Sequence, residues 1–468
     1  MNAQRVGLFA GLIVFVTMLM VPAPESMSTQ AWHVAALTLL MATWWMTEAI
    51  PLTATALLPF IVMPMAGVMT AAEAASKYYS PILFLILGGA FLALAIERVG
   101  LHRRLALAII GLAGKSSWSI LMAFMIATAV MSMLISNTSS TLIMAPIALA
   151  VLAAGGVKAG ETDGFAGALI MGVAFAASIG GLGTLVGSPT NAIAAGLINE
   201  TLGMELDFVS WMKFGMPIVI IGLPVCAAIL ILVQKVGRHS FDGQDAKAAI
   251  GKPGPWSISE KRLVPVVAIV VLGWLFLKQI QPFFPEKAVV DGTIAIIGGM
   301  LLFILPDGTG RRLLNWDEAN RAPWGVIMMF GGGLALAAGI IGSGLADWLG
   351  QALSPLQTVP VIVIAIALVA LVILVTEFAS NVATASGIMP VVASLILATG
   401  VDPVLLAVPA AMAASWGFML PSGTGPNAIA WSTNHIALPR MLKSGFLLDL
   451  TGIPIIIGTI WLVSFVIS

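Results

Sequence analysis

Long apolar runs recur along most of this 468-residue chain, and they constrain its fold more than any other feature. A helix that crosses a lipid bilayer needs ~20 apolar residues. Charged residues make up only 9% of the chain, against about 25% in soluble domains. We therefore predict an all-α polytopic membrane protein with about eleven transmembrane helices, near residues 6–22, 31–49, 52–68, 80–97, 165–198, 212–234, 263–280, 289–305, 324–342, 402–431 and 446–467.

Two further apolar stretches, residues 118–155 and 357–398, are interrupted by polar clusters at their centres. Each half of such a stretch is short for a full crossing. A hairpin that enters and leaves on one side of the membrane places the polar centre at its tip. Non-helical backbone is tolerated there when protein or a wet cavity covers it. We expect a re-entrant hairpin in each of the two stretches.

The positive charges predict an orientation. Cytoplasmic segments of membrane proteins carry an excess of Lys and Arg. With the N-terminus inside and eleven crossings, 17 of the 21 lysines and arginines fall on the cytoplasmic side. Residues 235–262 then form a cytoplasmic linker, and Ser468 at the C-terminus lies outside. Residues 1–30 hold a retained first transmembrane helix, because no A-x-A cleavage site follows the apolar run.

The two halves of the chain, residues 31–234 and 263–468, contain related local sequences. The landmarks Ser132, Ser136, Asn137 and Pro146 recur with one constant offset as Thr376, Ser380, Asn381 and Pro390. Further on, two predicted broken helices (165–198 and 402–431) contain Gly187-Ser-Pro-Thr-Asn191 and Gly423-Thr-Gly-Pro-Asn427. Five predicted crossings separate the two hairpins, so the second repeat is inverted relative to the first. Inverted repeats with interrupted helices are typical of secondary transporters.

Helix breaks inside a membrane supply binding groups without charged side chains. A helix that begins at a break exposes unpaired N–H groups and a partial positive charge, which together bind anions. Pro189 and Pro426 stand where such half-helices would begin. Unwound carbonyl groups and Asn oxygens suit a hard cation such as sodium. Because the hairpins and span centres contain no Lys or Arg, a co-bound cation would offset the charge of a bound anion.

Individual polar residues in these segments have two interpretations each. A Ser or Thr in a membrane helix either binds a ligand or bonds to its own helix and aids packing. Recurrence in both repeats favours a binding role for Asn137 and Asn381. Glu377 is a functional candidate because a carboxylate at membrane depth is costly. It could equally pair within its hairpin, and its counterpart in the first repeat is Met133.

Other classes of function find no support in the sequence. The formal net charge is zero, which gives no reason to expect a nucleic acid partner. The single cysteine, Cys226, excludes an intrachain disulfide, and the four histidines are scattered. The predicted spans contain no Ser/His pair, paired Asp or H-E-x-x-H pattern, so we do not expect an enzyme.

The chain resembles one known family, the divalent anion/sodium symporters (DASS, the INDY group). Trp44-Trp45-Met-Thr-Glu48-Ala-Ile-Pro51 is similar to an early signature of that family. Ser136-Asn137-Thr138 resembles its Ser-Asn-Thr hairpin motif, and Ser380-Asn381 resembles the second copy. The resemblance covers nearly the whole chain. It implies a homodimer in which each protomer has a scaffold part and a moving transport part that works as an elevator.

The resemblance also implies site residues. Two sodium sites would involve Ser132, Ser136, Asn137 and Gly187 in the first repeat, and Thr376, Ala379, Asn381 and Gly423 in the second. The substrate would lie between them, against Asn137, Thr138, Ser188, Ser380, Asn381 and Thr424. Two departures from the family pattern bear on selectivity. Val382 replaces a hydroxyl that the family offers the substrate, and the loops read Ser-Pro-Thr and Thr-Gly-Pro instead of Thr-Pro-Pro.

From these features we expect a secondary transporter of the inner membrane. It would couple sodium to the symport of a divalent anion, such as the C4-dicarboxylates succinate, malate and fumarate. Alternatives within transport are a cation-independent dicarboxylate exchanger and a sulfate carrier. The alternative from another class is an anion channel with a fixed pore, which uptake against a gradient would exclude.

Overall fold

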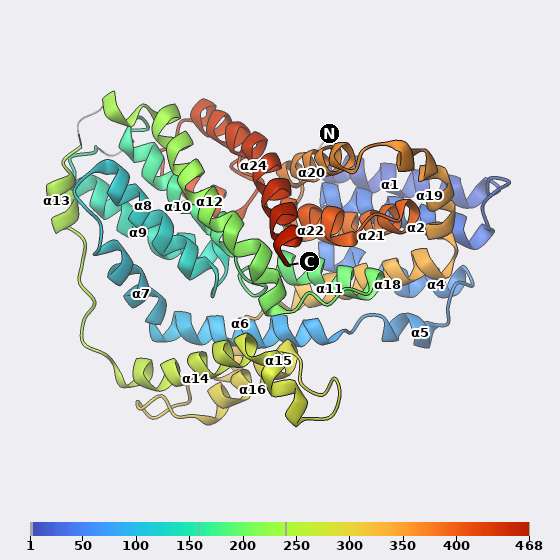
Figure 1. Ribbon diagram of the computed structural model, residues 1–468, viewed down its shortest axis with the longest axis horizontal. Helices are drawn as coiled ribbons and strands as arrows, with labels where there is room; N and C mark the ends of the chain where they lie inside the picture. Colours follow the sequence, from blue (N-terminus) through green and yellow to red (C-terminus); the bar gives the residue numbers. More distant parts are fainter. Residues whose placement is uncertain (1–2, 159, 239–240, 468) are drawn as a thin grey trace.

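The computed structural model describes residues 3–158, 160–238 and 241–467, which fold into helices joined by short connections (Figure 1). The first half contains α1 (Ala3–Met20), α2 (Thr29–Thr47), α3 (Leu52–Thr55), α4 (Leu58–Met65), α5 (Ala71–Ser76), α6 (Pro81–Val99), α7 (Leu101–Ile110), α8 (Ser117–Ser132), α9 (Asn137–Ala154), α10 (Phe165–Gly181), α11 (Pro189–Leu202) and α12 (Phe208–Gln234). The prediction for Ser468 lies outside the described residues.

The second half begins after a linker that contains the turn η1 (Val236–Arg238) and α13 (Gly243–Ala248). It contains α14 (Ile258–Leu275), α15 (Leu277–Ile280), η2 (Gln281–Phe283), α16 (Asp291–Ile304), α17 (Trp316–Ala319), α18 (Trp324–Gly342), α19 (Leu345–Leu353), η3 (Ser354–Thr358), α20 (Val361–Phe378), α21 (Asn381–Thr399), α22 (Pro403–Ala413), α23 (Gly425–Ser432) and α24 (Leu438–Ile467). The predicted all-α class is confirmed.

Within the described residues, eight helices are long and apolar enough to cross a membrane, or nine if the bent pair after residue 257 counts as one span. That pair bends by 79° at its break. Five shorter apolar helices accompany them, including α10 and α22. Both stop early, and the chain continues after a break as α11 and α23. This is one reason why the long helices are fewer than the predicted crossings, and the polytopic architecture is confirmed.

Helix α10 lies at the centre of one group of helices, packed by α8, α9 and α12. Every one of its residues is buried, and Gly and Ala dominate its sequence. A Cβ added at Gly180 would lie 2.3 Å from the Cα of Ala129, so the backbones of α8 and α10 approach closely there. Small residues allow this close approach of helices in membranes.

The two repeats interlock around the helix breaks. The helix after the first break, α11, packs against α21 of the second repeat, and α23 packs against α9 of the first. A Cβ added at Gly425 would lie only 2.4 Å from Oγ1 of Thr138. The tip of α9 therefore touches the start of α23, so polar groups from both halves of the sequence meet.

A second group of helices lies beside this one. Helix α6 packs against α14 and α16, while α18 packs against α2, α3 and α4. Figure 1 shows α6 running along the edge of the α8–α12 group, with α14–α16 on its other side. The turn between α16 and α17 is tied to α6 by an ion pair between Arg98 and Asp307. Burial alone would raise the pKa of Asp307, but hydrogen bonds from Thr309 and Arg98 outweigh it and hold that pKa well below its usual range.

The linker from 235 to 262 packs partly on the first helix group. The ring centroids of Phe241 and Phe165 are 4.2 Å apart, and the amide of Asp242 donates to the carbonyl of Gly155. Asp242 also caps α13, which contacts α8 and α9. The linker thus begins by covering the ends of the α8–α9 pair and then extends toward α14 (Figure 1).

Candidate binding site at the helix breaks

Oxygen atoms converge at the first pair of breaks, between α8 and α9 and after α10. The hydroxyl of Ser132 donates to the carbonyl of Ala177 at 2.7 Å, and Oδ1 of Asn137 lies 2.6 Å from the same hydroxyl. If the amide of Asn137 is turned over, its nitrogen instead donates to Ser132, Ala177 and Gly187 at 2.6–3.2 Å. The side-chain oxygen therefore faces only other acceptors. Such a cluster fits a cation held by neutral oxygens, because a cation among them would offset the repulsion between acceptor atoms.

The same arrangement recurs in the second repeat. The hydroxyl of Thr376 donates to the carbonyl of Ala414 at 2.7 Å, and Oδ1 of Asn381 lies 2.9 Å from it. Thr376 is fully buried, as Ser132 is. The implied ligand Ala379 ends α20 in an extended conformation. A Cβ at Gly423 would meet the carbonyl oxygens of Leu420 and Glu377 at 3.3 and 3.4 Å, so this glycine borders another carbonyl-rich loop.

Each half-helix that follows a break is capped by a hydroxyl. Ser136 accepts a hydrogen bond from the amide of Ser139 at the start of α9, and Ser380 accepts one from the amide of Ala383 at the start of α21. Ser188 and Thr424 cap α11 and α23 in the same way. The Ser136 hydroxyl thus serves its own helix, and it is not among the groups that contact Ser132 and Asn137 in the cluster. Capping leaves the remaining first-turn N–H groups to bind a ligand.

A cavity of about 260 Å³ opens beside the first pair of breaks. The start of α9 contributes Ser136 and Ser139 to its wall, and the start of α11 contributes Ser188 and Pro189. Gly187 also lines it. Two helix N-termini therefore face one cavity, which is an arrangement that attracts an anion.

The opposite wall of this cavity comes from the second helix group, through α6 and the turn before α18. Among the described lining residues, the charged ones are Glu97 and Arg321. Of the implied substrate residues, Ser188 lines the cavity. The others, Asn137, Thr138, Ser380, Asn381 and Thr424, lie at the neighbouring breaks and are not part of its described wall.

Two asparagines hold the unwound loops in shape, and the sequence did not identify this role for them. Nδ2 of Asn191 donates to the carbonyls of Gly181 and Thr184 at 2.7 and 2.8 Å, across the first unwound loop. Nδ2 of Asn427 donates to the carbonyl of Leu420 at 3.0 Å across the second. The signal was their shared spacing, because each asparagine stands four residues after the glycine of its loop, Gly187 or Gly423. Each asparagine holds its loop in the unwound shape that exposes carbonyl groups.

Glu377 supports the second break from the hairpin side. Its two carboxylate oxygens accept hydrogen bonds from the amides of Met419 and Leu420, at 2.9 and 3.0 Å. These contacts agree with a structural role for Glu377. Its partners, however, lie after α22 and not within the hairpin. A second buried carboxyl group, Asp449 of α24, lies beside it. Sequence reasoning missed Asp449, although an acidic residue inside a predicted span was a sufficient signal.

Val382 has apolar neighbours. Its partly buried side chain packs against both hydrophobic clusters of the protein, the large one that runs through most of the helices and the smaller one around α2, α4 and α18. The side chain that stands in place of the expected hydroxyl therefore sits where two apolar surfaces meet.

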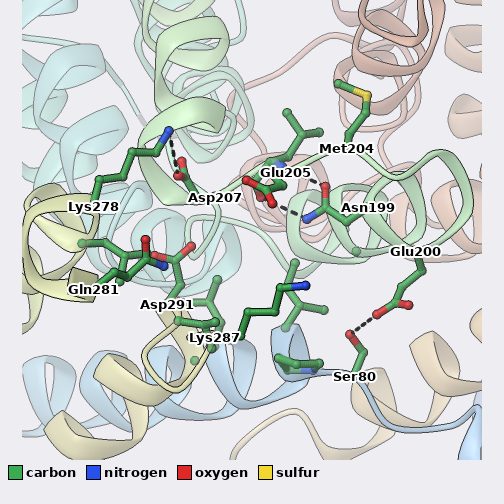
Figure 2. A pocket seen from close by; sticks show the side chains of 18 of the residues that line it. Ser80, Asn199, Glu200, Met204, Glu205, Asp207, Lys278, Gln281, Lys287 and Asp291 are labelled. Carbon is green, nitrogen blue, oxygen red and sulfur yellow. Dashed lines mark hydrogen bonds and ion pairs between the residues drawn. The ribbon is translucent and has the colours of Figure 1, made fainter. Parts of the chain in front are cut away.

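A larger cavity, of about 840 Å³, lies away from the breaks (Figure 2). It separates the end of α11 and the start of α12 from α6, α15 and α16. Three contacts cross it: Ser80 donates to Glu200 at 2.9 Å, Lys278 pairs with Asp207 at 3.8 Å, and the amide of Phe208 donates to Asp291 at 2.8 Å. Its wall contains both acidic and basic side chains. The smaller cavity is the candidate binding site, because paired helix N-termini and oxygen clusters meet beside it.

Interrupted helices in two interlocked repeats, with polar groups gathered at the breaks, define this protein as a secondary transporter. The chain belongs to the sodium:sulfate symporter family, whose transmembrane region matches residues 2–467. The family expected from the sequence motifs is thereby confirmed. This family consists of transporters and not of enzymes.

Relatives of known name are similar over almost the full chain. A sodium-dependent dicarboxylate transporter, SdcS, of Staphylococcus saprophyticus is 40% identical over 98% of this chain and 91% of its own. SdcS of Staphylococcus aureus strain USA300 matches with the same identity and coverage. The crystal structure of the Alcanivorax borkumensis YdaH transporter has a TM-score of 0.55 at 15% identity, covering 94% of this chain and 98% of that one. The latter likeness supports the fold alone.

Proposed function

We propose that this protein is a sodium-coupled symporter of C4-dicarboxylates. The observation that carries the proposal is the pair of matching oxygen clusters, Ser132–Asn137 and Thr376–Asn381, at two helix breaks. The sodium-dependent dicarboxylate transporters that share 40% of its sequence support the choice of both ions.

The sodium ions would bind at the two oxygen clusters. Each offers a hydroxyl, an Asn side-chain oxygen and a nearby backbone carbonyl, and none of these groups carries a charge. Neutral oxygen ligands suit a monovalent hard cation. Because the clusters are buried, a sodium ion bound there would also offset the negative charge of the bound anion. Sodium is a co-transported substrate in this scheme, so its sites must empty in each cycle.

The dicarboxylate would bind in the 260 Å³ cavity, with one carboxylate at the N-termini of α9 and α11. Thr138 would approach it from the tip of α9, and Ser380, Asn381 and Thr424 would approach it from the second repeat. The helix group around α10 would then move past the group around α6 and α18 as an elevator. The cavity wall holds Glu97 and Arg321, which lie toward the cytoplasm in the proposed orientation, so this arrangement would be the inward-facing one.

The proposal includes an assembly and an orientation. The protein would be a homodimer in the inner membrane, with its N-terminus in the cytoplasm and its C-terminus outside. Labelling tests the orientation. In a Cys226→Ser background, Lys247→Cys should react with an impermeant thiol reagent only after the membrane is opened. Labelling of intact cells at this position would overturn the orientation.

Transport by purified protein in liposomes tests the function. An inward sodium gradient should drive uptake of labelled succinate above equilibrium, and potassium should not replace it. Uptake that needs internal dicarboxylate but no sodium would identify an exchanger. Preference for sulfate over succinate would identify a sulfate carrier, and flux that only follows the anion gradient would identify a channel. Each of these three results overturns the proposal.

A further inference from the structure

An arginine faces the cavity from the side opposite the helix N-termini. Arg321 lies in the short turn between α17 and α18 and lines the cavity. Its backbone is held in place, because its amide donates to the carbonyl of Glu318 at 3.1 Å and the next amide donates to Ala319 at 2.9 Å. The residue is exposed. A well-fixed turn therefore presents a flexible cation to the cavity.

The guanidinium of Arg321 makes no hydrogen bond or ion pair with the residues that the structure describes. The nearest carboxylate in sequence, Glu318, is already engaged: it lies 3.3 Å from Arg98 and 2.7 Å from Arg311. Arg98 itself is fixed to Asp307. The carboxylate across the cavity, Glu97, is farther from Arg321 than an ion pair requires within the described structure. Arg321 is thus available for an anion.

A dicarboxylate needs partners for two separated charges. The N-termini of α9 and α11 satisfy one carboxylate. The opposite wall consists largely of apolar groups, among them Ile86, Ala90 and Ala93 of α6, which leave a second carboxylate without a donor. A guanidinium binds a carboxylate through two parallel N–H···O bonds. Arg321 is the described group in this wall with that capacity.

We propose that Arg321 binds the second carboxylate of the substrate and makes the cytoplasmic face selective for dianions. The inference rests on the proposed function. Arg321 belongs to the α6–α18 group, whereas the two N-termini belong to the group around α10. Movement of one group past the other separates Arg321 from the bound anion. The contact therefore acts when the cavity opens to the cytoplasm, and it has no counterpart in binding from outside.

The test compares the two faces of the membrane. Sodium-driven uptake of labelled succinate is measured in right-side-out and inside-out vesicles that contain wild type, Arg321→Gln, Arg321→Lys or Glu97→Gln. Arg5→Gln is the matched control, because it removes an exposed arginine that does not line the cavity. In inside-out vesicles, Arg321→Gln should raise the half-saturating succinate concentration about three- to tenfold, with a smaller effect in high salt.

The remaining variants sharpen the outcome. Arg321→Lys should restore part of the affinity, and Glu97→Gln should lower the half-saturating concentration because it removes a competing negative charge. Values in right-side-out vesicles should not change. The inference is wrong if Arg321→Gln matches wild type on both faces, shifts both faces equally, or has no more effect than Arg5→Gln. Failure of wild type to transport any dicarboxylate would instead overturn the proposed function.

Discussion

Thr376 and Asn381 stand five residues apart on either side of a helix break, with Oγ1 and Oδ1 separated by 2.9 Å. The hydroxyl also donates to Ala414, so its single hydrogen is already used. The asparagine oxygen then faces a lone pair, which is repulsive unless a positive charge lies between them. The repetition of this contact by Ser132 and Asn137 shows that it belongs to the architecture of both repeats.

Substitutions at Asn137 separate two orientations of its amide. If Oδ1 faces a sodium ion, Asn137→Ala should abolish sodium-coupled uptake and lower sodium affinity by ~1–3 kcal/mol. Asn137→Asp keeps the ligand oxygen and should retain sodium-dependent protection from heat, which arises by mass action. If the amide nitrogen faces the cluster, the aspartate should destabilise the protein in sodium and in potassium alike. Thermal unfolding of the purified variants in each salt distinguishes the two.

Replacement by alanine should be less well tolerated at Gly187, at the first break, than at Gly423, at the second. A Cβ at Gly187 would lie 2.5 Å from the carbonyl oxygen of Gly181 and 2.9 Å from that of Ser132, and both are backbone atoms that cannot move alone. Gly187→Ala should therefore abolish transport. At Gly423 the nearest atom would be 3.3 Å away, so Gly423→Ala serves as the milder comparison. Equal uptake by both variants would show that the first cluster is less tightly built than its contacts indicate.

A cross-link across the larger cavity tests movement of one helix group past the other. Ser80 and Glu200 touch across it in Figure 2, one from each group. In a Cys226→Ser background, Ser80→Cys with Glu200→Cys should be joined by a short thiol cross-linker, and uptake should stop until the link is cleaved. Thr70→Cys with Glu73→Cys is the control, because that pair is also in contact but lies within one helix cap. Undiminished transport by the cross-linked Ser80–Glu200 protein would contradict an elevator.

Glu377 and Asp449 should respond differently to loss of charge. Glu377 accepts two backbone N–H groups, and a glutamine there offers one oxygen and one nitrogen. Glu377→Gln should leave a buried N–H unpaired and cost ~1–3 kcal/mol of stability. Asp449 has no pair of short backbone hydrogen bonds like that of Glu377, so Asp449→Asn should cost less. Melting temperatures of the two variants in detergent provide the comparison, and a larger loss for Asp449→Asn would reverse our assignment of the bracing residue.

Much of this architecture follows from the sequence. Apolar runs predicted a polytopic helical protein, and the recurrence of Ser136-Asn137 as Ser380-Asn381 identified both hairpin breaks. Local rules sufficed there, because a hydroxyl before a helix caps it wherever it lies. Contacts between distant segments were beyond such rules. Nothing near Arg321 in the sequence connects it to Ser188, because only packing of α6 and α18 beside α11 brings the two to one cavity.

Val382 offers a last test of how the second hairpin meets the substrate. Its counterpart Thr138 is exposed and touches the start of α23, whereas Val382 is partly buried and packs against both apolar clusters. Valine and threonine have almost the same shape, so Val382→Thr changes one methyl group to a hydroxyl with little steric effect. A hydroxyl without a partner among apolar side chains costs about 1–3 kcal/mol.

We therefore expect Val382→Thr to lower the melting temperature and to leave the order of preference among anions unchanged. Competition of succinate, malate, 2-oxoglutarate and sulfate with labelled succinate measures that order. The reverse substitution, Thr138→Val, is the matched comparison, because it removes a hydroxyl from the exposed tip and should alter the preference with little loss of stability. Stronger binding of one dicarboxylate by Val382→Thr, at an unchanged melting temperature, would mean that position 382 reaches the substrate. The apolar residue at that position would then determine selectivity instead of serving only to pack the two apolar clusters together.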